Sequence, residues 1–274
     1  MPRPLSVQLY TVRDQLAADW QGTVRRLAGL GYGAVEPYDV LCDPKGHRLI
    51  LDDLGLSVSG AHAAQLLAPD PGPALDAVAT LGTDLAIVPA GLPPEDFTTR
   101  EGLARAADRL NSLVEPARRH GVRVGYHNHW WEIEPRFGVN GSPDDGGGDD
   151  GGGNDGGDAG SGTRHAVELL AELLDPAVFL EIDTYWAAVG GADVPALLRR
   201  LGDRVVALHL KDGPGTKEDP NVAVGEGTMG VPEIVAAAPR ALRVVEFDAC
   251  AGTADDLLDA LAASRAYLTS LAAA

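Results

Sequence analysis

Short apolar runs alternate along the chain with longer segments of helical periodicity, and this alternation repeats eight times. The runs are rich in Val and Leu and lie next to Gly, Pro or Asp, which is typical of parallel strands covered on both faces. The expected strands are Ser6–Thr11, Ala34–Asp39, Ser57–Ala63, Leu85–Gly91, Val122–His129, Val178–Trp186, Val205–Asp212 and Arg243–Ala249.

The segments between these strands carry apolar residues at helical spacing. Leu103, Ala106 and Leu110 are one example, and Leu257 and Leu261 begin another near the end of the chain. Strands that alternate with helices predict βαβ units and a parallel sheet, and eight such units favour closure into a barrel over an open sheet. The expected fold class is therefore α/β, a single (β/α)8 TIM-barrel domain over residues 1–274.

One segment interrupts this pattern after the fifth strand. Residues 141–162 read GSPDDGGGDDGGGNDGGDAGSG, with six Asp and no Lys or Arg. Such a composition cannot bury enough apolar surface to pack, so it predicts a disordered Gly/Asp-rich insertion. A calcium-binding repeat would need an apolar residue in each turn, which this tract does not supply. An inert insertion on the functional face of the barrel is the favoured interpretation.

Composition narrows the classes of partner. The formal net charge is −18, so phosphate-rich nucleic acids and anionic membranes would be repelled, and a small molecule is the expected partner. The first residues lack the apolar region of a signal peptide, and no run of 18 apolar residues exists. Cys42 and Cys250 lie far apart without metal-type spacing, which is typical of reduced thiols in the cytoplasm. The oligomeric state stays open.

Candidate chemistry gathers where the expected strands end. In a β/α barrel, residues at the carboxyl ends of the strands face the active site. Four of the seven histidines fall there, together with many of the carboxylates. The residues at these ends are Glu36, Asp39, His62, Tyr126, His127, Asn128, His129, Glu132, Glu181, Asp183, His209, Lys211, Asp212, Glu246 and Asp248.

Alternation along a strand indicates which of these residues share a face. Glu181 and Asp183 do so, which allows Glu181 to lie one layer deeper behind the site. Imidazoles and carboxylates with an open position suit Mn, Mg, Co or Zn, and such an ion polarises hydroxyl and carbonyl oxygens. Structural roles compete with these functions: His62 could simply pack in the core, and Lys211 could neutralise nearby carboxylates.

These residues stand in ordered blocks that resemble the xylose isomerase-like TIM barrel family, specifically the sugar phosphate isomerase/epimerase group. The resemblance covers nearly the whole chain. The blocks are SVQLYTVRD, GYGAVEPYD, GYHNHWWEIEP, LEIDTYWAAVGGAD, RVVALHLKDG, VGEG and VVEFD.

The resemblance implies one divalent ion bound by His127, Asp183, His209 and Glu246. It also marks two departures from the family pattern. Ketose 3-epimerases of this group carry a Glu at the position of His127, and several relatives carry a substrate-binding His at the position of Trp186. Endonuclease IV shares the barrel, but Trp186 and the acidic charge oppose that function.

The sequence thus predicts a metal-dependent isomerase or epimerase of a keto-sugar or sugar phosphate, working by proton abstraction next to a carbonyl. Glu246, His127 and Glu132 are the expected catalytic groups. The residues expected to orient the substrate are Glu36, His62, His129, Trp186 and Lys211. Two alternatives remain: a dehydratase or lyase acting on an inosose or a 3-keto-glycoside, and a sugar-binding barrel without catalysis.

Overall fold

The computed structural model describes residues 4–138 and 162–273. The predicted insertion at 141–162 lies outside the described residues, except for Gly162. Among the described residues, no helix combines the length and apolar character that a membrane crossing requires.

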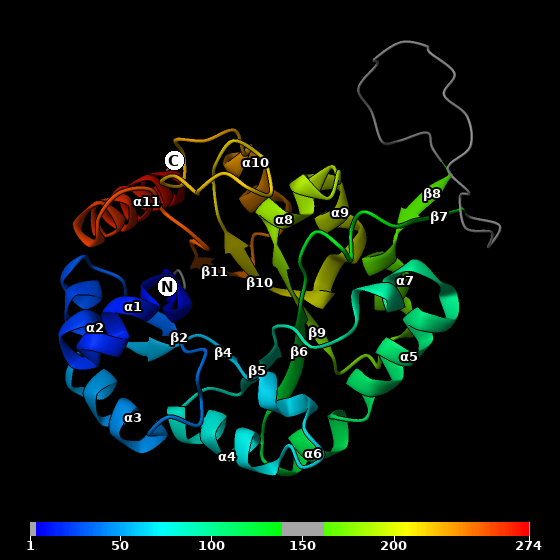
Figure 1. Ribbon diagram of the computed structural model, residues 1–274, viewed down its shortest axis with the longest axis horizontal. Helices are drawn as coiled ribbons and strands as arrows, with labels where there is room; N and C mark the ends of the chain where they lie inside the picture. The colour runs from blue at the N-terminus through cyan, green and yellow to red at the C-terminus, as the bar shows by residue number, and fades with distance from the viewer. Residues whose placement is uncertain (1–3, 139–161, 274) are drawn as a thin grey trace.

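A single parallel sheet forms the wall of a barrel, with helices outside it (Figure 1). Its neighbours run in the order β3-β2-β1-β11-β10-β9-β6-β5-β4. The strands are β1 (Ser6–Gln8), β2 (Ala34–Glu36), β3 (Ser57–Val58), β4 (Ala61–His62), β5 (Leu85–Val88), β6 (Arg123–His127), β9 (Phe179–Asp183), β10 (Val205–Leu210) and β11 (Leu242–Val245). The two ends of this order, β3 and β4, are halves of one strand interrupted at Ser59 and Gly60, so the sheet comes round on itself and the predicted eight-stranded TIM barrel is confirmed.

The helices surround this wall and bury their apolar faces against it. They are α1 (Arg13–Ala18), α2 (Trp20–Gly29), α3 (Pro44–Asp53), α4 (Gly72–Leu81), α5 (Arg100–Asn111), α6 (Val114–Arg119), α7 (Ala166–Leu173), α8 (Thr184–Val189), α9 (Val194–Leu201), α10 (Val231–Ala237) and α11 (Ala254–Ala273). Short 3-10 helices are η1 (Leu9–Val12), η2 (Ala64–Leu67), η3 (Pro94–Thr98) and η4 (Gly202–Arg204). The periodic residues Leu103, Ala106 and Leu110 are all buried on α5, as their spacing predicts.

An antiparallel pair lies outside the barrel sheet. β7 (Arg136–Gly138) pairs with β8 (Thr163–His165), and α7 follows directly. This pair flanks the segment that the structure does not describe. The insertion therefore belongs to the connection between the fifth barrel strand, β6, and the sixth, β9, as the sequence predicted.

The inside of the barrel is layered. At the amino ends of the strands, Leu85, Ile87 and Phe179 form a separate apolar cluster. Gly125 on β6 makes room for this cluster, because a Cβ atom there would lie 2.2 Å from the Phe179 ring. Toward the carboxyl ends, the inward positions of β9 change from Phe179 to Glu181 and Asp183. An apolar plug thus fills one end, and polar groups are left to the other.

The observed strands are shorter than predicted at their carboxyl ends. The first ends at Gln8, where η1 begins, and the sixth ends at Asp183, whose Oδ1 accepts the backbone N–H of Trp186 and caps α8 at 2.9 Å. Asp39, His129, Trp186 and Asp248 therefore lie on the loops or helices that follow the strands.

Candidate metal and active site

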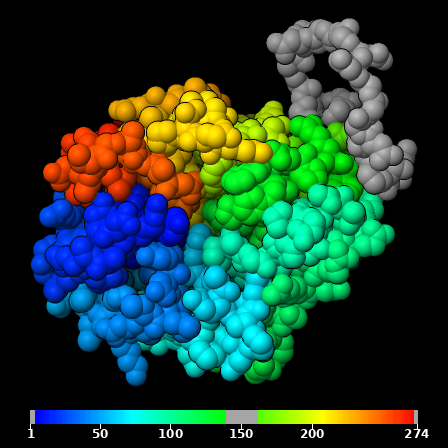
Figure 2. Space-filling model, in the orientation of Figure 1, coloured from blue at the N-terminus to red at the C-terminus, as the bar shows by residue number. Residues whose placement is uncertain are grey.

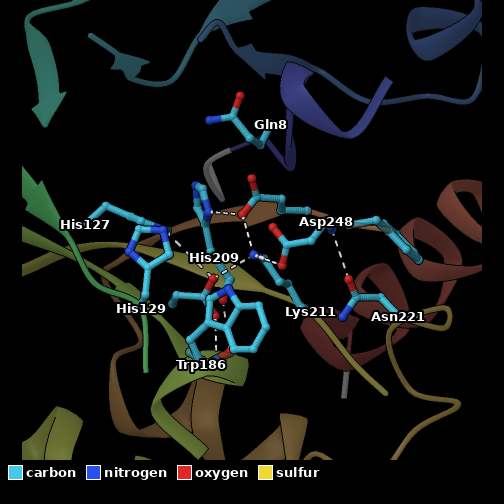
Figure 3. A network of polar contacts seen from close by, with 12 residues as sticks. Gln8, His127, His129, Trp186, His209, Lys211, Asn221 and Asp248 are labelled. Carbon is cyan, nitrogen blue, oxygen red and sulfur yellow. Dashed lines mark hydrogen bonds and ion pairs between the residues drawn. The ribbon is translucent and has the colours of Figure 1, made fainter. Parts of the chain in front are cut away.

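Four side chains from four neighbouring strands converge at the carboxyl end of the barrel. His127 ends β6, Asp183 ends β9, His209 lies on β10, and Glu246 directly follows β11. One ligand atom from each lies within 4.8 Å of those from the other three, and all four residues are buried. Figure 3 shows His127 and His209 facing a common centre. The sequence prediction that these residues share one mouth agrees with this geometry.

Strand register explains the convergence. His209 lies beside Asp183 in the β9–β10 pairing, and His127 lies beside Glu181 in the β6–β9 pairing. The backbone at Asp183 is held by Asn128, whose Oδ1 accepts its N–H at 3.0 Å. Because Asp183 Oδ1 caps α8, Asp183 Oδ2 is the oxygen directed at the cluster.

Lys211 supplies a buried positive charge beside the cluster. Its Nζ lies 2.9 Å from Asp183 Oδ2, 2.8 Å from Glu246 Oε2 and 2.6 Å from Asp248 Oδ2. The ammonium group also lies 5.5 Å from the centre of the Trp186 ring. Lys211, with its dashed contacts in Figure 3, therefore balances three carboxylates. A cation held by Asp183 and Glu246 would share their oxygens with it.

A second polar layer lies below the first. Glu181 and Glu36 are fully buried there, and His62 Nε2 lies 2.7 Å from Glu181 Oε2. His209 Nε2 lies 2.7 Å from Glu36 Oε1, to which the Gln8 amide also donates at 2.8 Å. Glu36 and His62, predicted to orient a substrate, thus lie in the layer beneath the mouth.

The buried carboxylates differ in whether burial or nearby positive charge dominates their pKa. Burial would raise the pKa of Glu246, but the Lys211 ammonium and His209 hold it well below its ordinary value. Burial dominates at Asp183 and raises its pKa to about 6, with Lys211 opposing the shift. Burial, with the charge of Glu181, raises the pKa of Glu36 to about 7. Glu246 is therefore ionised throughout the neutral range.

The imidazoles differ in the same way. Burial and the neighbouring His209 lower the pKa of His127 to about 3, and burial with His127 lowers that of His129 to about 2. Burial opposes protonation of His209 as well, yet Glu181 and Glu246 raise its pKa well above the ordinary value. His127 and His129 are therefore neutral, the state in which an imidazole can bind a metal.

Glu132 does not join the cluster. The Tyr126 hydroxyl donates to its Oε1 at 2.5 Å, and the His129 backbone N–H donates to its Oε2 at 2.8 Å. Tyr126 has the opposite strand parity to His127 and packs against Phe97 on the helix side. The Glu132 carboxylate thus supports the loop after β6, and the expectation that it transfers protons finds no support in this geometry.

Aromatic side chains line one side of the mouth. Trp186 and Trp130 lie with ring centres 4.7 Å apart, and Trp131 stacks on His129 at 4.1 Å. Trp186 is almost fully buried, whereas the His129 side chain is partly exposed. In the space-filling view, segments far apart in the sequence meet around a hollow near the centre of this face (Figure 2).

Sequence reasoning did not single out Gln8 or assign a role to Asn128. Both are side-chain amides at strand ends, and each holds a neighbouring group of the site in place. In the structure, Gln8 lies beside Glu36 in the β1–β2 pairing and is completely buried. In the sequence, Gln8 could have been noticed as an amide side chain within the expected strand SVQLY.

Comparisons with solved structures show the same fold over nearly the whole chain. A sugar phosphate isomerase/epimerase from Parabacteroides distasonis matches with a TM-score of 0.74 and 22% identity, over 98% of this chain and 95% of that one. The probable 3-DHS dehydratase AsbF from Bacillus anthracis matches with a TM-score of 0.68 and 15% identity, over 97% and 99%. A xylose isomerase-like TIM barrel protein from Mycobacterium smegmatis in complex with magnesium matches with a TM-score of 0.65 and 16% identity, over 98% and 96%.

At these identities the structural likenesses show the fold alone. A search of curated proteins found no match. The family model for the xylose isomerase-like TIM barrel matches residues 73–241, more than half of the chain. This match and the barrel agree with the resemblance seen in the sequence blocks, and the chain belongs to the xylose isomerase-like TIM barrel family.

Proposed function

We propose that this chain is a divalent-metal-dependent isomerase or epimerase that moves a proton next to the carbonyl group of a keto-sugar. The observation that carries the proposal is the convergence of His127, Asp183, His209 and Glu246 from four strands onto one buried point. Two imidazoles and two carboxylates form a mixed N/O donor set that suits Mn, Mg, Co or Zn. The family also contains a solved member in complex with magnesium.

The donor set fits such an ion on its charges as well. Four buried carboxylates, Glu36, Glu181, Asp183 and Glu246, line the two layers, and a bound divalent cation would replace the proton that His209 carries in its absence. A divalent cation at the cluster would polarise the hydroxyl and carbonyl oxygens of a sugar and ease removal of the adjacent C–H proton. The residues that would hold it are His127, Asp183, His209 and Glu246.

Glu246 is the proposed general base. Its carboxylate is ionised because Lys211 and His209 stabilise the negative charge, and its side chain is slightly exposed at the mouth. It would accept the proton from the carbon next to the carbonyl and return it after rearrangement. His129 is the residue proposed to hydrogen-bond a substrate hydroxyl, since its side chain is partly exposed, whereas those of His127 and His209 are buried.

The surroundings favour an unphosphorylated substrate. The cations expected near the mouth are engaged by other groups of the protein: Arg13 donates to Asp248 O, Arg136 donates to Gly191 O, and Lys217 pairs with Glu134. Lys211 is committed to carboxylates. A phosphate group usually requires an Arg cluster or a helix N-terminus. Trp186 is proposed to pack against the carbon face of the sugar.

A dehydratase or lyase is the second candidate, favoured by the structural likeness to the probable 3-DHS dehydratase AsbF. It would begin with the same proton abstraction and then expel a leaving group on the next carbon. Inososes and 3-keto-glycosides are the substrates proposed for that case. A sugar-binding barrel without catalysis is the third candidate, and it would move no proton.

Solvent deuterium separates the three candidates. The metal-loaded protein is incubated in D2O with a panel of keto-sugars and inososes, and the products are followed by NMR. Inversion or carbonyl migration with deuterium uptake identifies the isomerase, and loss of water or of an aglycone identifies the lyase. Failure to exchange any candidate would reject both enzymatic proposals.

Replacing Glu246 with Gln tests the general base. We expect E246Q to lose activity by about 10²–10⁴-fold or more while keeping its fold, because the amide cannot accept a proton. The matched control is E115Q, which removes an exposed carboxylate paired with Arg118 on α6 and should leave turnover unchanged. Full activity in E246Q would rule out its assignment as the base.

A further inference from the structure

The deep layer contains one carboxylate oxygen on which three imidazoles converge. Glu181 Oε2 lies 2.7 Å from His62 Nε2, 3.2 Å from His127 Nδ1 and 3.2 Å from His209 Nε2. Glu181 is fully buried and lies two residues before Asp183 on the same face of β9. The residues His62, His127, Glu181 and His209 also satisfy the distance requirement for a metal site. Two functions are compatible with this group: it binds a second metal ion, or it holds the ligands of the outer metal cluster in place.

The two histidines shared by both layers present opposite nitrogens to them. His127 turns Nδ1 toward Glu181 and Nε2 toward Asp183, 3.9 Å from its Oδ2. His209 turns Nε2 toward Glu181 and Glu36, and Nδ1 toward Glu246, 2.6 Å from its Oε2. Each ring therefore has one inner nitrogen at a deep carboxylate and one outer nitrogen at the predicted metal cluster.

A neutral imidazole has one N–H group and one lone pair, so it cannot serve both layers as a ligand. The deep carboxylates Glu181 and Glu36 are buried and accept hydrogen bonds, and an imidazole N–H is the donor that such an oxygen requires. When the inner nitrogens of His127 and His209 carry the protons, the outer nitrogens keep their lone pairs. Two ions in the two layers would demand two lone pairs from each ring.

We propose that the two deep carboxylates are positioning residues for the ligand histidines. Glu181 holds the N–H group of His127 at Nδ1, and Glu36 holds that of His209 at Nε2, so that His127 ligates through Nε2 and His209 through Nδ1. The inner group is then the support of a single metal site, and one ion binds per chain. Histidine ligands that donate their other N–H to a carboxylate are a general means of fixing ring orientation and tautomer. The inference rests on the proposed metal at the outer cluster.

The tautomers can be read directly in the unmodified protein. Chain labelled with ¹⁵N-histidine is saturated with Zn²⁺, which is diamagnetic, and long-range ¹H–¹⁵N correlation spectra distinguish Nδ1–H from Nε2–H rings. We expect one ligand histidine of each kind: Nδ1–H for His127 and Nε2–H for His209, assigned with H127N and H209N. The same tautomer on both rings, or two Zn²⁺ ions per chain by calorimetry, would overturn the inference.

Replacing Glu181 with Gln tests the support itself. Gln keeps an oxygen that can accept the His127 N–H but lacks the negative charge of Glu181. The hydrogen bond that orients the ring is therefore weaker, and Zn²⁺ affinity should fall by about 10–100-fold. The control is E168Q, which alters another buried carboxylate held by Arg200 and by the His165 backbone, and it should bind Zn²⁺ like the wild type. Equal affinity in wild type, E181Q and E168Q would contradict the proposal.

Co²⁺ absorption adds a readout that a loss of stability alone would not change. In E181Q we expect an altered ligand-field spectrum at saturating Co²⁺, and in E168Q the wild-type spectrum. If E181Q does not fold, the tautomers of His127 and His209 in the wild type still test the inference. Correct tautomers in a protein that exchanges no deuterium would reject the proposed function and keep this inference. Deuterium exchange by a protein that binds no Zn²⁺ would reject this inference and keep the proposed proton transfer.

Discussion

Single residues in this barrel carry free-energy costs that only their partners offset. Glu36, Glu181, Asp183 and Glu246 are all buried, and an unpaired buried carboxylate is strongly disfavoured. Nearby positive charge outweighs burial at Glu181 and Glu246 and lowers their pKa values, whereas burial prevails at Asp183 and Glu36 and raises theirs. The contacts of each residue, and not its type, therefore decide its charge.

Glu132 offers a test of this balance away from the metal cluster. Burial raises its pKa to about 7, and the hydrogen bonds from Tyr126 and His129 oppose the shift only in part. A carboxyl group whose pKa is higher in the folded state contributes stability at low pH, which is lost as pH rises through the folded value. Between pH 5 and 8, wild type should lose about 2–3 kcal/mol relative to E132Q.

The measurement is urea unfolding of both proteins across this pH range. E132Q removes the titration, so the difference in free energy of unfolding isolates this one group from the others that titrate nearby. A difference that stays constant from pH 5 to 8 would mean that Glu132 is not held in the neutral form.

At the scale of elements, the pairing of β6 with β9 links the apolar plug of the barrel to the polar layers above it. It joins Gly125 to Phe179 and His127 to Glu181. The apolar plug and the polar layers are therefore stacked on the same two strands. Packing at the lower end determines whether the ligands at the upper end stay in register.

A methyl group at Gly125 should disturb this pairing. The added Cβ atom would overlap the Phe179 ring, so the strands must separate or the ring must leave its place. We expect G125A to lower the free energy of unfolding by about 1–3 kcal/mol or more, and to weaken Zn²⁺ binding through the shift of β6. The control is G29A on α2, where an added Cβ meets nothing within 4 Å. Equal urea midpoints for G125A and G29A would contradict this account.

At the scale of the whole molecule, the acidic charge and the metal cluster act together. The chain carries a formal net charge of −18, of which the six Asp of residues 141–162 supply one third. Such a charge disfavours polyanionic partners and favours small cations at sites that gather carboxylates. The four ligands come from four strands, so an ion bound by them would tie distant parts of the chain together.

Metal binding should therefore stabilise the fold. A ligand that binds only the folded state at 100 times its dissociation constant adds about 2.7 kcal/mol to the free energy of unfolding. We expect Mn²⁺ to raise the urea midpoint and a chelator to reverse the effect. D183N should abolish the stabilisation, whereas D203N, which alters an exposed Asp paired with Arg240, should retain it. Equal stabilisation of D183N would place the ion elsewhere.

The sequence by itself determined the architecture and the candidate ligands. Alternating apolar runs and helical segments indicated eight βα units, and the polarity of the strand ends pointed to His127, Asp183, His209 and Glu246. These patterns are local, because strand alternation and helical spacing depend on near neighbours and on which face is buried. The structure confirmed the barrel.

Strand parity already allowed a deeper place for Glu181, but tertiary structure alone decided the depth of the other site residues and the direction in which their side chains face. The sequence allowed Glu36 and His62 to face a substrate and Glu132 to act in catalysis, but the first two lie in the lower layer and Glu132 faces Tyr126. Which nitrogen of His127 or His209 faces which carboxylate also depends on strand register and barrel closure. Those are set by pairings between residues far apart in the chain, which no local pattern records.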